Sequence, residues 1–191
     1  YLIHQPNSTL QKFREGWGND EIAFEVPSIK IPCVSIHRGP HPTYHTNLDN
    51  LSQFSKSSFE ESKNIIKNII KCLDKNYTIE IKNWDSLICL ANPDINLYVE
   101  PLSVSNIKQK SDVENLSFYN NLSVLEKKYL MQNNQKIINF CYKFQSFLSH
   151  NLNTTIIDLA YEFSLPVLFV KEYIEKLKEK GFVSLTFKNF N

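Results

Sequence analysis

The sequence lacks several features that mark particular classes of protein. No apolar run approaches the roughly 20 residues that a membrane-spanning helix needs. The chain has 21 Lys and Arg residues against 20 Asp and Glu residues, so it lacks the basic excess that is typical of nucleic-acid-binding proteins. With 42% hydrophobic residues, its 191 residues are enough to bury the core of one medium domain or of two small ones. We therefore expect a soluble globular protein.

The chain also has little cysteine and no Cys-x-x-Cys pair. Its cysteines are Cys33, Cys72, Cys89 and Cys141, and each lies among apolar residues, as in "IPCVSI" and "IIKCLD". Cysteine in such surroundings usually packs as a small apolar side chain. We expect free thiols, which favours a reducing compartment and a cytoplasmic location.

The first part of the chain predicts an α/β arrangement. Residues 28–38, "SIKIPCVSIHR", are rich in β-branched residues and predict a short buried strand of a mostly parallel sheet. A loop at 39–50 follows, and residues 55–76 predict an amphipathic helix with Ser58 and Glu61 as its capping box. In an α/β sheet such a loop lies at the carboxyl end of the strand, where sites are usually built.

The remainder of the chain predicts two further regions. Residues 77–125 combine strand-like pieces, a turn at Asn92-Pro93-Asp94 and a polar stretch, 105–121, that predicts a linker. Residues 126–191 predict a winged-helix layout of three helices and a strand. The predicted elements are 133–150, 153–164 with an Asn or Thr cap, 165–181 with Pro166 in its first turn and Gly181 at its end, and the strand 182–187.

The loop "HPTYHTNLDN" carries the most distinctive chemistry. His37, His41 and His45 recur at four-residue spacing, which on a helix would place them on one face. Pro40 and Pro42 exclude that helix, so the spacing gives no support for a three-histidine metal site. His45 alone follows the predicted strand and precedes the capped helix. From the residues alone it is either a metal ligand or catalytic group, or a loop histidine with a hydrogen-bonded ring.

Two adjacent acids form a second candidate. Asp20 and Glu21 follow two glycines in "GWGNDEIAF", and glycine permits a close approach of the backbone to a ligand. Neighbouring carboxylates on such a loop suit a metal site or an amine-binding pocket, while solvated loop acids are the simpler interpretation. Asp49 has a similar alternative as a turn residue that satisfies backbone N–H groups.

Taken together, these motifs resemble a known family. The order G-x-G-N-D-E, I-P-x-V-S-I-x-R-G and Y-H-T-x-x-D-N resembles the C-terminal part of zinc-dependent exopeptidases of the aminopeptidase, carboxypeptidase and glutaminyl-cyclase superfamily. The chain is similar to a bacterial branch of aminopeptidase-like proteins that carries a Gly-Ser-Asp-Glu loop, a P-V-x-S-x-x-R strand and a P-x-Y-H-T-S-x-D loop, and that ends in a winged helix. The segment "NPDINLYVEP" also resembles the P-x-L-x-x-R-x-L-Y-P segment of this branch.

The resemblance implies a fold, a division into domains and an activity. Residues 1–76 would form the C-terminal portion of an α/β/α zinc exopeptidase domain. Residues 77–125 would be a small connector with short strands, and residues 126–191 a winged-helix-like domain. The implied activity is hydrolysis of a peptide or amide bond by a zinc metallopeptidase, with zinc as its cofactor.

The resemblance also assigns the residues near the metal. His45 matches the last zinc ligand of the family, and Asp20 matches the acid of the Ser-Asp-Glu or Ser-Asp-His loop beside the metal centre. Asp20 and its neighbour Glu21 are thereby expected as catalytic residues that shape the metal's surroundings or receive a substrate amine. Asp49 would brace the histidine loop. Because a histidine binds metal in its neutral form, activity is expected to fall well below about pH 6.

The resemblance assigns two further residues to substrate binding. At two other positions the sequence differs from the usual residues of the branch. Arg38 matches the strand-end arginine of the branch and would pair with a substrate carboxylate or an active-site acid, while Tyr44 would line the pocket. The branch usually has Ser where Asn19 stands and Arg where Ile22 stands, so a direct contact to the substrate is expected to be lost.

A larger departure concerns the other metal ligands of the family. They come from a His-x-Asp segment, a paired-Glu segment that includes the general base, and a further acid, all N-terminal to this region. One histidine cannot make a hydrolytic zinc site, which needs about three protein ligands and an open position. We expect this chain, which begins with Tyr1, to be inactive alone and to need a companion N-terminal segment of the same protein. A homo-oligomer is left open.

An alternative from another class is a non-enzymatic winged-helix regulator or scaffold with a degenerate exopeptidase-like region. The third predicted helix, "LPVLFVKEYIEKLKEKG", mixes Lys with Glu, which suits phosphate contacts poorly. Nucleic acid and membranes are therefore not expected partners, and a structural or partner-docking module is favoured. His-x-Asp and Glu-Glu segments upstream in the same protein would favour the enzyme.

Overall fold

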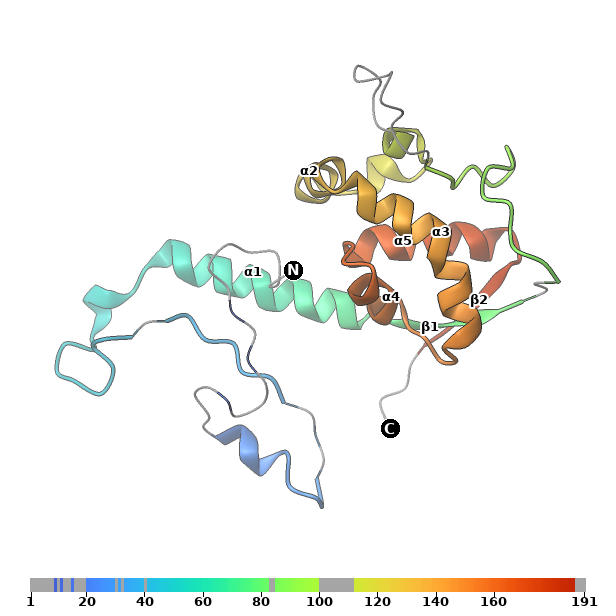
Figure 1. Cartoon of the computed structure of the whole chain (residues 1–191). Coiled ribbons are helices and arrows are strands. Elements are labelled where there is room, and N and C mark those ends of the chain that lie inside the picture. The colour runs from blue at the N-terminus through green and yellow to red at the C-terminus, as the bar shows by residue number, and fades with distance from the viewer. Residues whose placement is uncertain are drawn as a thin grey trace. The chain divides into compact units, whose positions relative to one another are not determined.

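The computed structural model describes residues 9, 11, 15, 20–29, 31, 33–39, 41–82, 85–99 and 112–187 (Figure 1). The chain divides into two compact units, Tyr1–Glu60 and Glu61–Asn191, called unit 1 and unit 2 below. Within the described ranges, the structure contains five α-helices and one two-stranded antiparallel sheet, so the fold is α/β in the broad sense and rich in helix. None of the helices in the described part of the chain is both long enough and apolar enough to cross a bilayer.

Unit 1 has little regular structure in its described part. It contains the 3-10 helices Asp20–Ala23 and Leu51–Gln53. The buried strand predicted at 28–38 is wrong, because the backbone of residues 31 and 33–39 is irregular and Val34 is 78% exposed. A strand of a parallel sheet needs a neighbouring strand to complete its hydrogen bonds, and the described residues of unit 1 provide none.

A closed loop takes the place of that strand. The Ile31 N–H donates to the Phe24 carbonyl at 2.8 Å, and the Cys33 N–H donates to the Glu25 carboxylate at 3.0 Å. The chain therefore folds back on itself over these ten residues, instead of extending into a sheet.

Helix α1, Lys56–Leu73, begins two residues before the predicted cap. The Ser58 N–H donates to Ser55 Oγ at 3.3 Å, so Ser55 caps the first turn and the predicted cap at Ser58 is wrong. Four apolar side chains at helical spacing are about half exposed: Phe59, Ile66, Ile70 and Leu73, at 53%, 50%, 52% and 44%. This row of residues is called the α1 apolar face below.

The sheet of unit 2 joins two segments that are far apart in the sequence. Strand β1, Tyr77–Ile81, pairs antiparallel with β2, Val183–Phe187, from Tyr77 opposite Phe187 to Ile81 opposite Val183. On the other side of β1, Thr78 forms a bridge with Thr155, and the Ile79 N–H donates to the Thr154 carbonyl at 2.9 Å. β1 therefore lies between β2 and the residues that precede α4.

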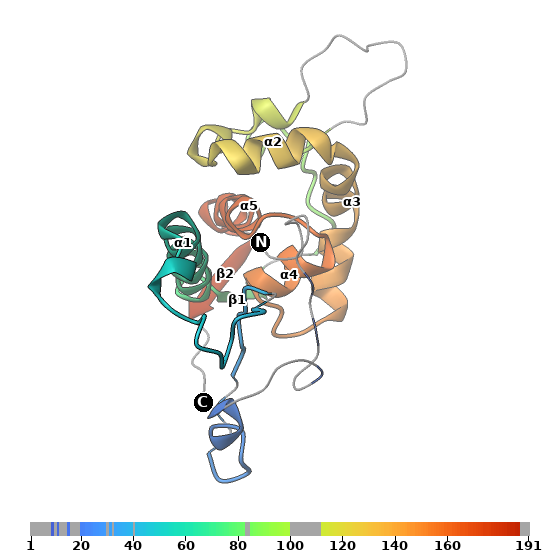
Figure 2. The same cartoon turned by 90° about the vertical axis from the view of Figure 1, so that its left-hand side faces the viewer.

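Four further helices complete unit 2. They are α2 (Val124–Gln132), α3 (Asn134–His150), α4 (Ile156–Glu162) and α5 (Val167–Glu179). The three helices and the strand predicted between 133 and 187 are thus confirmed, whereas α2 was not predicted. In Figures 1 and 2, α5 lies between α2 and the sheet, and α5 also contacts β2 directly.

Local signals explain where these helices begin and end. Thr155 caps α4, in agreement with the predicted Asn or Thr cap, and forms a capping box with Asp158. Ser123 and Glu126 form the same motif at the start of α2. After α5, Gly181 has φ 79° and its N–H donates to Lys178, which is the hydrogen bonding of a glycine that ends a helix. The end predicted at Gly181 is confirmed.

One hydrophobic core holds unit 2 together, and the predicted linker contributes to it. Val113, Leu116 and Phe118 are buried, so the expectation of a polar linker is wrong for the described residues 112–121. Ile88, Leu90, Leu97 and Val99 of the predicted connector belong to the same core. From the helices the core includes Leu130, Ile137, Phe140, Phe144, Leu148, Ile156, Leu159, Phe169, Val170, Tyr173, Ile174 and Leu177.

Two buried polar side chains fasten the segment 85–99 to the helices. The Gln145 side chain accepts from the Ile88 N–H at 2.7 Å and donates to the Ile88 carbonyl at 3.1 Å. The Tyr173 hydroxyl donates to the Leu97 carbonyl at 2.8 Å, and burial raises the pKa of Tyr173 well above its usual value. These bonds satisfy backbone groups of Ile88 and Leu97, residues that lie outside the β-sheet.

Candidate functional site

The candidate site of unit 1 is built on three consecutive turns between His41 and Asp49. The Tyr44 N–H donates to the His41 carbonyl, the Thr46 N–H to the Thr43 carbonyl and the Asp49 N–H to the Thr46 carbonyl, each at 3.1 Å. Pro42 excludes a helix here, so short turns satisfy the backbone. The loop expected from the two prolines is thus formed.

His45 has a backbone conformation that is unusual for histidine. Its φ is 61°, in the left-handed region, and it is the third residue of the turn Thr43–Thr46. A turn whose third residue has a positive φ usually carries Gly or Asn there, because a Cβ atom is strained in that conformation. The His45 side chain is exposed and makes no hydrogen bond to any described residue. The structure therefore presents an imidazole whose nitrogen atoms are open to a ligand.

Tyr44 fixes the plane of that imidazole. The rings of Tyr44 and His45 stack with centroids 4.0 Å apart and 23° between their planes. Tyr44 is itself 45% exposed, and one face of its ring is covered by His45. The pair forms a small aromatic surface on the turn, in agreement with a position at the edge of a binding site.

Asp49 and Arg38 lie near the turn in different ways. Only the backbone N–H of Asp49 bonds to the turn, and its exposed carboxylate has no hydrogen-bond partner among the described residues. The Arg38 guanidinium donates to the Ser58 carbonyl, in the first turn of α1, at 3.3 Å. That contact ties the segment before the turn to the start of the helix after it.

The Thr46 side chain is the one that the sequence-based prediction missed. Thr46 Oγ1 donates to the Thr43 carbonyl at 2.6 Å and accepts from the Leu48 N–H at 3.2 Å. The bracing expected of Asp49 is thus also available from a neighbouring hydroxyl. Thr is a common hydrogen-bonding residue in turns, and this was the signal that could have identified Thr46.

Asp20 and Glu21 lie in the 3-10 helix Asp20–Ala23, and their side chains lie outside the described residues. For zinc, the donor chemistry of the described part of unit 1 fits one ligand and not a complete set. His45 offers an exposed imidazole, and no group of three His, Cys, Asp or Glu side chains within the described ranges could hold a metal ion. The fit is that of a single ligand contributed to a site with about three.

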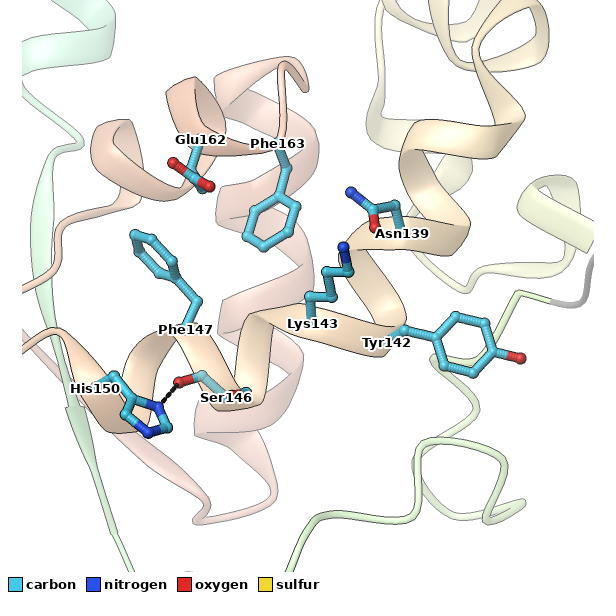
Figure 3. A pocket seen from close by; sticks show the side chains of 8 residues that line it. All are labelled: Asn139, Tyr142, Lys143, Ser146, Phe147, His150, Glu162 and Phe163. Atoms are coloured by element: carbon cyan, nitrogen blue, oxygen red, sulfur yellow. Dashed lines mark hydrogen bonds between the residues drawn. The ribbon is translucent and has the colours of Figure 1, made fainter.

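Unit 2 has a shallow pocket of its own, of about 510 Å³, between α3 and the end of α4. Phe147 and Phe163 form its floor, with ring centroids 5.9 Å apart. Glu162 and His150 lie toward one end and Lys143 toward the other, and the His150 Nδ1 atom donates to the Ser146 carbonyl at 2.7 Å (Figure 3). The pocket could hold an apolar side chain between charged groups.

The polar face of α5 is poorly placed for nucleic acid. Lys171 Nζ lies 2.7 Å from the Glu175 carboxylate and 3.2 Å from that of Glu172. Burial lowers the pKa of Lys171, but the hydrogen bonds and charges of Glu175 and Glu172 outweigh it and raise the pKa above its ordinary value. Asn121 also donates to Glu172 at 3.1 Å, so a neighbouring segment covers part of this face. These lysine and glutamate charges are used within the protein and offer little to phosphate groups.

Comparison with known proteins gives one match. A family model described as "Domain of unknown function (DUF4910)" matches residues 2–76. No curated protein and no solved structure matches the chain. The matched residues include both motif-bearing loops and α1, and their bounds are close to those of the domain predicted at 1–76.

Proposed function

We propose that residues 1–76 are the C-terminal portion of a zinc-dependent aminopeptidase-like hydrolase of peptide or amide bonds. A companion N-terminal segment of the same protein completes this domain, and residues 126–191 form a winged-helix-like domain. In this proposal His45 is one zinc ligand, and the companion segment supplies the others and the general base. Zinc, when bound, supplies the Lewis acidity for the hydrolysis. The isolated chain of 191 residues is inactive.

The observation that carries the proposal is the state of His45. An exposed histidine with φ 61°, stacked on Tyr44 and without a hydrogen-bond partner among the described residues, has no evident role in stabilising unit 1. Strained conformations of this kind cluster at functional sites, where the rest of the fold maintains them. Exposure of a neutral imidazole nitrogen is also what metal binding requires.

The apolar surface of unit 1 supports the need for a companion. Ile36, Leu48, Leu51 and Phe54 are 44%, 58%, 89% and 59% exposed. Single exposed apolar residues are ordinary, but a unit with most of its large apolar side chains exposed usually meets a partner. Phe59, the residue of the α1 apolar face that belongs to unit 1, is 53% exposed as well. A companion segment that supplies sheet strands would cover these residues and would give the described residues of 28–38 the neighbouring strands that they lack within the described part of the chain.

The other side chains of the turn have roles that follow from their positions. Tyr44 stacks on the imidazole and lines the pocket. Arg38, with its charge anchored at the start of α1, attracts a substrate carboxylate or an acid of the site. Asp20 and Glu21 shape the surroundings of the metal or receive the substrate amine.

Unit 2 supports an accessory role more than a role in binding DNA. A short turn joins α4 to α5, and β2 follows α5, which is the order of a winged helix. The α5 face that would read DNA is ion-paired and partly covered by Asn121. A docking or structural module agrees better with these contacts.

The test is to replace His45 in the protein that includes the companion segment. His45→Ala should lower zinc content by at least about tenfold and abolish hydrolysis of aminoacyl anilides, because a zinc site with a missing ligand loses both affinity and geometry. His41→Ala is the matched control, since His41 is an exposed histidine in the same loop. It should keep wild-type zinc content and turnover.

Wild-type zinc content and turnover in His45→Ala would contradict the assignment of this ligand. A wild-type protein that binds no zinc and hydrolyses no substrate of the panel would favour the alternative, a non-enzymatic scaffold with a degenerate exopeptidase-like region.

A further inference from the structure

The turn that carries His45 is closed by one hydroxyl group. Thr46 donates twice to the same acceptor, because both its N–H, at 3.1 Å, and its Oγ1, at 2.6 Å, bond to the Thr43 carbonyl. Thr46 Oγ1 also accepts from the Leu48 N–H at 3.2 Å. One side chain thus bonds the backbone on both sides of His45.

This clamp acts on the residue with the least stable conformation of the loop. A left-handed φ is unfavourable for a residue with a Cβ atom, so the turn around His45 needs compensating interactions. The Tyr44 ring stacks on the imidazole. The Thr46 hydroxyl makes two hydrogen bonds to the backbone on either side of His45. A turn without this hydroxyl would lose both of them, and an exposed loop exchanges its remaining backbone bonds readily for water.

We propose that Thr46 is a positioning residue: its hydroxyl holds His45 in the left-handed turn and so presents the imidazole to zinc in one fixed direction. This inference rests on the proposed function for the identity of the ligand, and on the hydrogen bonds alone for the clamp. Thr46 does not bind the metal or the substrate. It acts only through the backbone of His45.

The variants that test it differ by single groups. Thr46→Val keeps the shape of the side chain and removes the hydroxyl, whereas Thr46→Ser keeps the hydroxyl. Thr43→Val is the control, because it removes a hydroxyl from the same turn that makes no hydrogen bond to a described residue. All three changes lie outside the hydrophobic core of unit 2, and each variant is checked for wild-type far-ultraviolet circular dichroism.

Two measurements are made on each variant. The first is the coupling between the amide and α protons of His45 by NMR in the 191-residue chain, which reports φ without any metal. The second is zinc affinity in the protein with its companion segment, by competition with a chromophoric chelator, together with the visible spectrum of the cobalt(II) form. Neither readout depends on turnover.

We expect Thr46→Val to change the His45 coupling and to weaken zinc binding about tenfold, the lower end of the range for residues that orient metal ligands. Thr46→Ser should restore both, and Thr43→Val should change neither. An unchanged His45 coupling in Thr46→Val overturns the positioning role, and so does an equal loss in Thr43→Val. A wild-type protein that binds no zinc overturns the proposed function instead, and the coupling measurement still decides the role of Thr46.

Discussion

Unit 2 and unit 1 differ in what holds them together. Unit 2 buries large aromatic and aliphatic side chains from its helices, from β1 and from the segment 85–99. In unit 1, by contrast, none of the described residues is buried, and the contacts among them include turns, single hydrogen bonds and the Tyr44–His45 ring stack. The motifs around Asp20 and His45 thus lie in the unit whose described residues form no buried core, and not in the unit that has one. A sequence motif can be recognisable where the described residues around it show little packing.

The largest change in stability is expected from a core substitution in unit 2. Phe140 is fully buried, and its ring centroid lies 5.0 Å from that of Phe144 and 4.9 Å from that of Tyr173. Phe140→Ala should lower the free energy of unfolding by about 3–5 kcal/mol, because it leaves a cavity among these rings. Urea unfolding followed by circular dichroism measures the change.

Leu51→Ala is the matched substitution in unit 1, where Leu51 is 89% exposed. It should change the same free energy by less than about 0.5 kcal/mol. Comparable losses in the two variants would mean that unit 1 has a core of its own and would remove the contrast.

A smaller test concerns the segment predicted as a connector. Gln145→Leu keeps most of the side-chain volume but removes both partners of the Ile88 backbone. We expect a loss of about 2–3 kcal/mol, because a buried N–H and a buried carbonyl are left without partners. Faster amide exchange at Ile88 would locate the effect. Ser149→Ala, on the exposed side of α3, serves as control and should cost less than about 0.5 kcal/mol. If Gln145→Leu left the free energy of unfolding unchanged, the hydrogen bonds between Gln145 and the segment 85–99 would contribute nothing to the stability of unit 2.

The smallest expected effect is an increase in stability. Ser164, between α4 and α5, has φ 50°, and the Leu165 N–H that follows it donates to the Ala160 carbonyl at 2.9 Å. Ser164→Gly should stabilise unit 2 by about 0.5 kcal/mol, since glycine removes a strain of about 1–2 kcal/mol but gains more freedom in the unfolded chain. Thermal unfolding measures it. Asn153→Gly, at φ 62°, should gain less because Asn already tolerates this conformation.

Ser164 and His45 share a left-handed backbone, and the comparison of the two sharpens the functional argument. Ser164 adopts this conformation just after the end of α4, and its replacement by glycine is expected to increase stability. Glycine at position 45 would relieve the same strain and would delete the imidazole. If Ser164→Gly lowered stability instead, positive φ would be a poor indicator of strain in this protein, and the case for His45 would weaken.

Elements that are stabilised by nearby residues were predicted correctly, and elements that depend on tertiary contacts were not. The three helices and the strand near the C-terminus were predictable because caps and periodic apolar residues are local, as with Thr155 and Gly181. The segment 28–38 was misjudged because apolar β-branched residues become a strand only beside other strands. The stretch 112–121 was misjudged because Val113, Leu116 and Phe118 are buried by tertiary contacts, in a segment whose overall composition is polar.

For the candidate site, the residue types were predictable and most of the geometry was not. The sequence indicated a loop at His45 and singled out this histidine above His37 and His41. It could not indicate the φ of 61°, the stacked Tyr44 ring or the hydroxyl clamp from Thr46. These depend on which of several turn types the backbone adopts, and a single sequence rarely determines that choice.

The position of β1 between β2 and Thr155 has a consequence for synthesis of the chain. β2 is made more than a hundred residues after β1, as in the hydrogen bond from the Thr186 hydroxyl to the Glu80 carboxylate 106 positions away. While the helices are being made, both edges of β1 are unpaired, one until Thr154 and Thr155 are made and the other until β2 is made. Unpaired strand edges invite association with other chains. β1 and β2 can pair only after the helices between them have been made. A truncation that removes β2 should therefore leave one edge of β1 unpaired and yield a chain that aggregates.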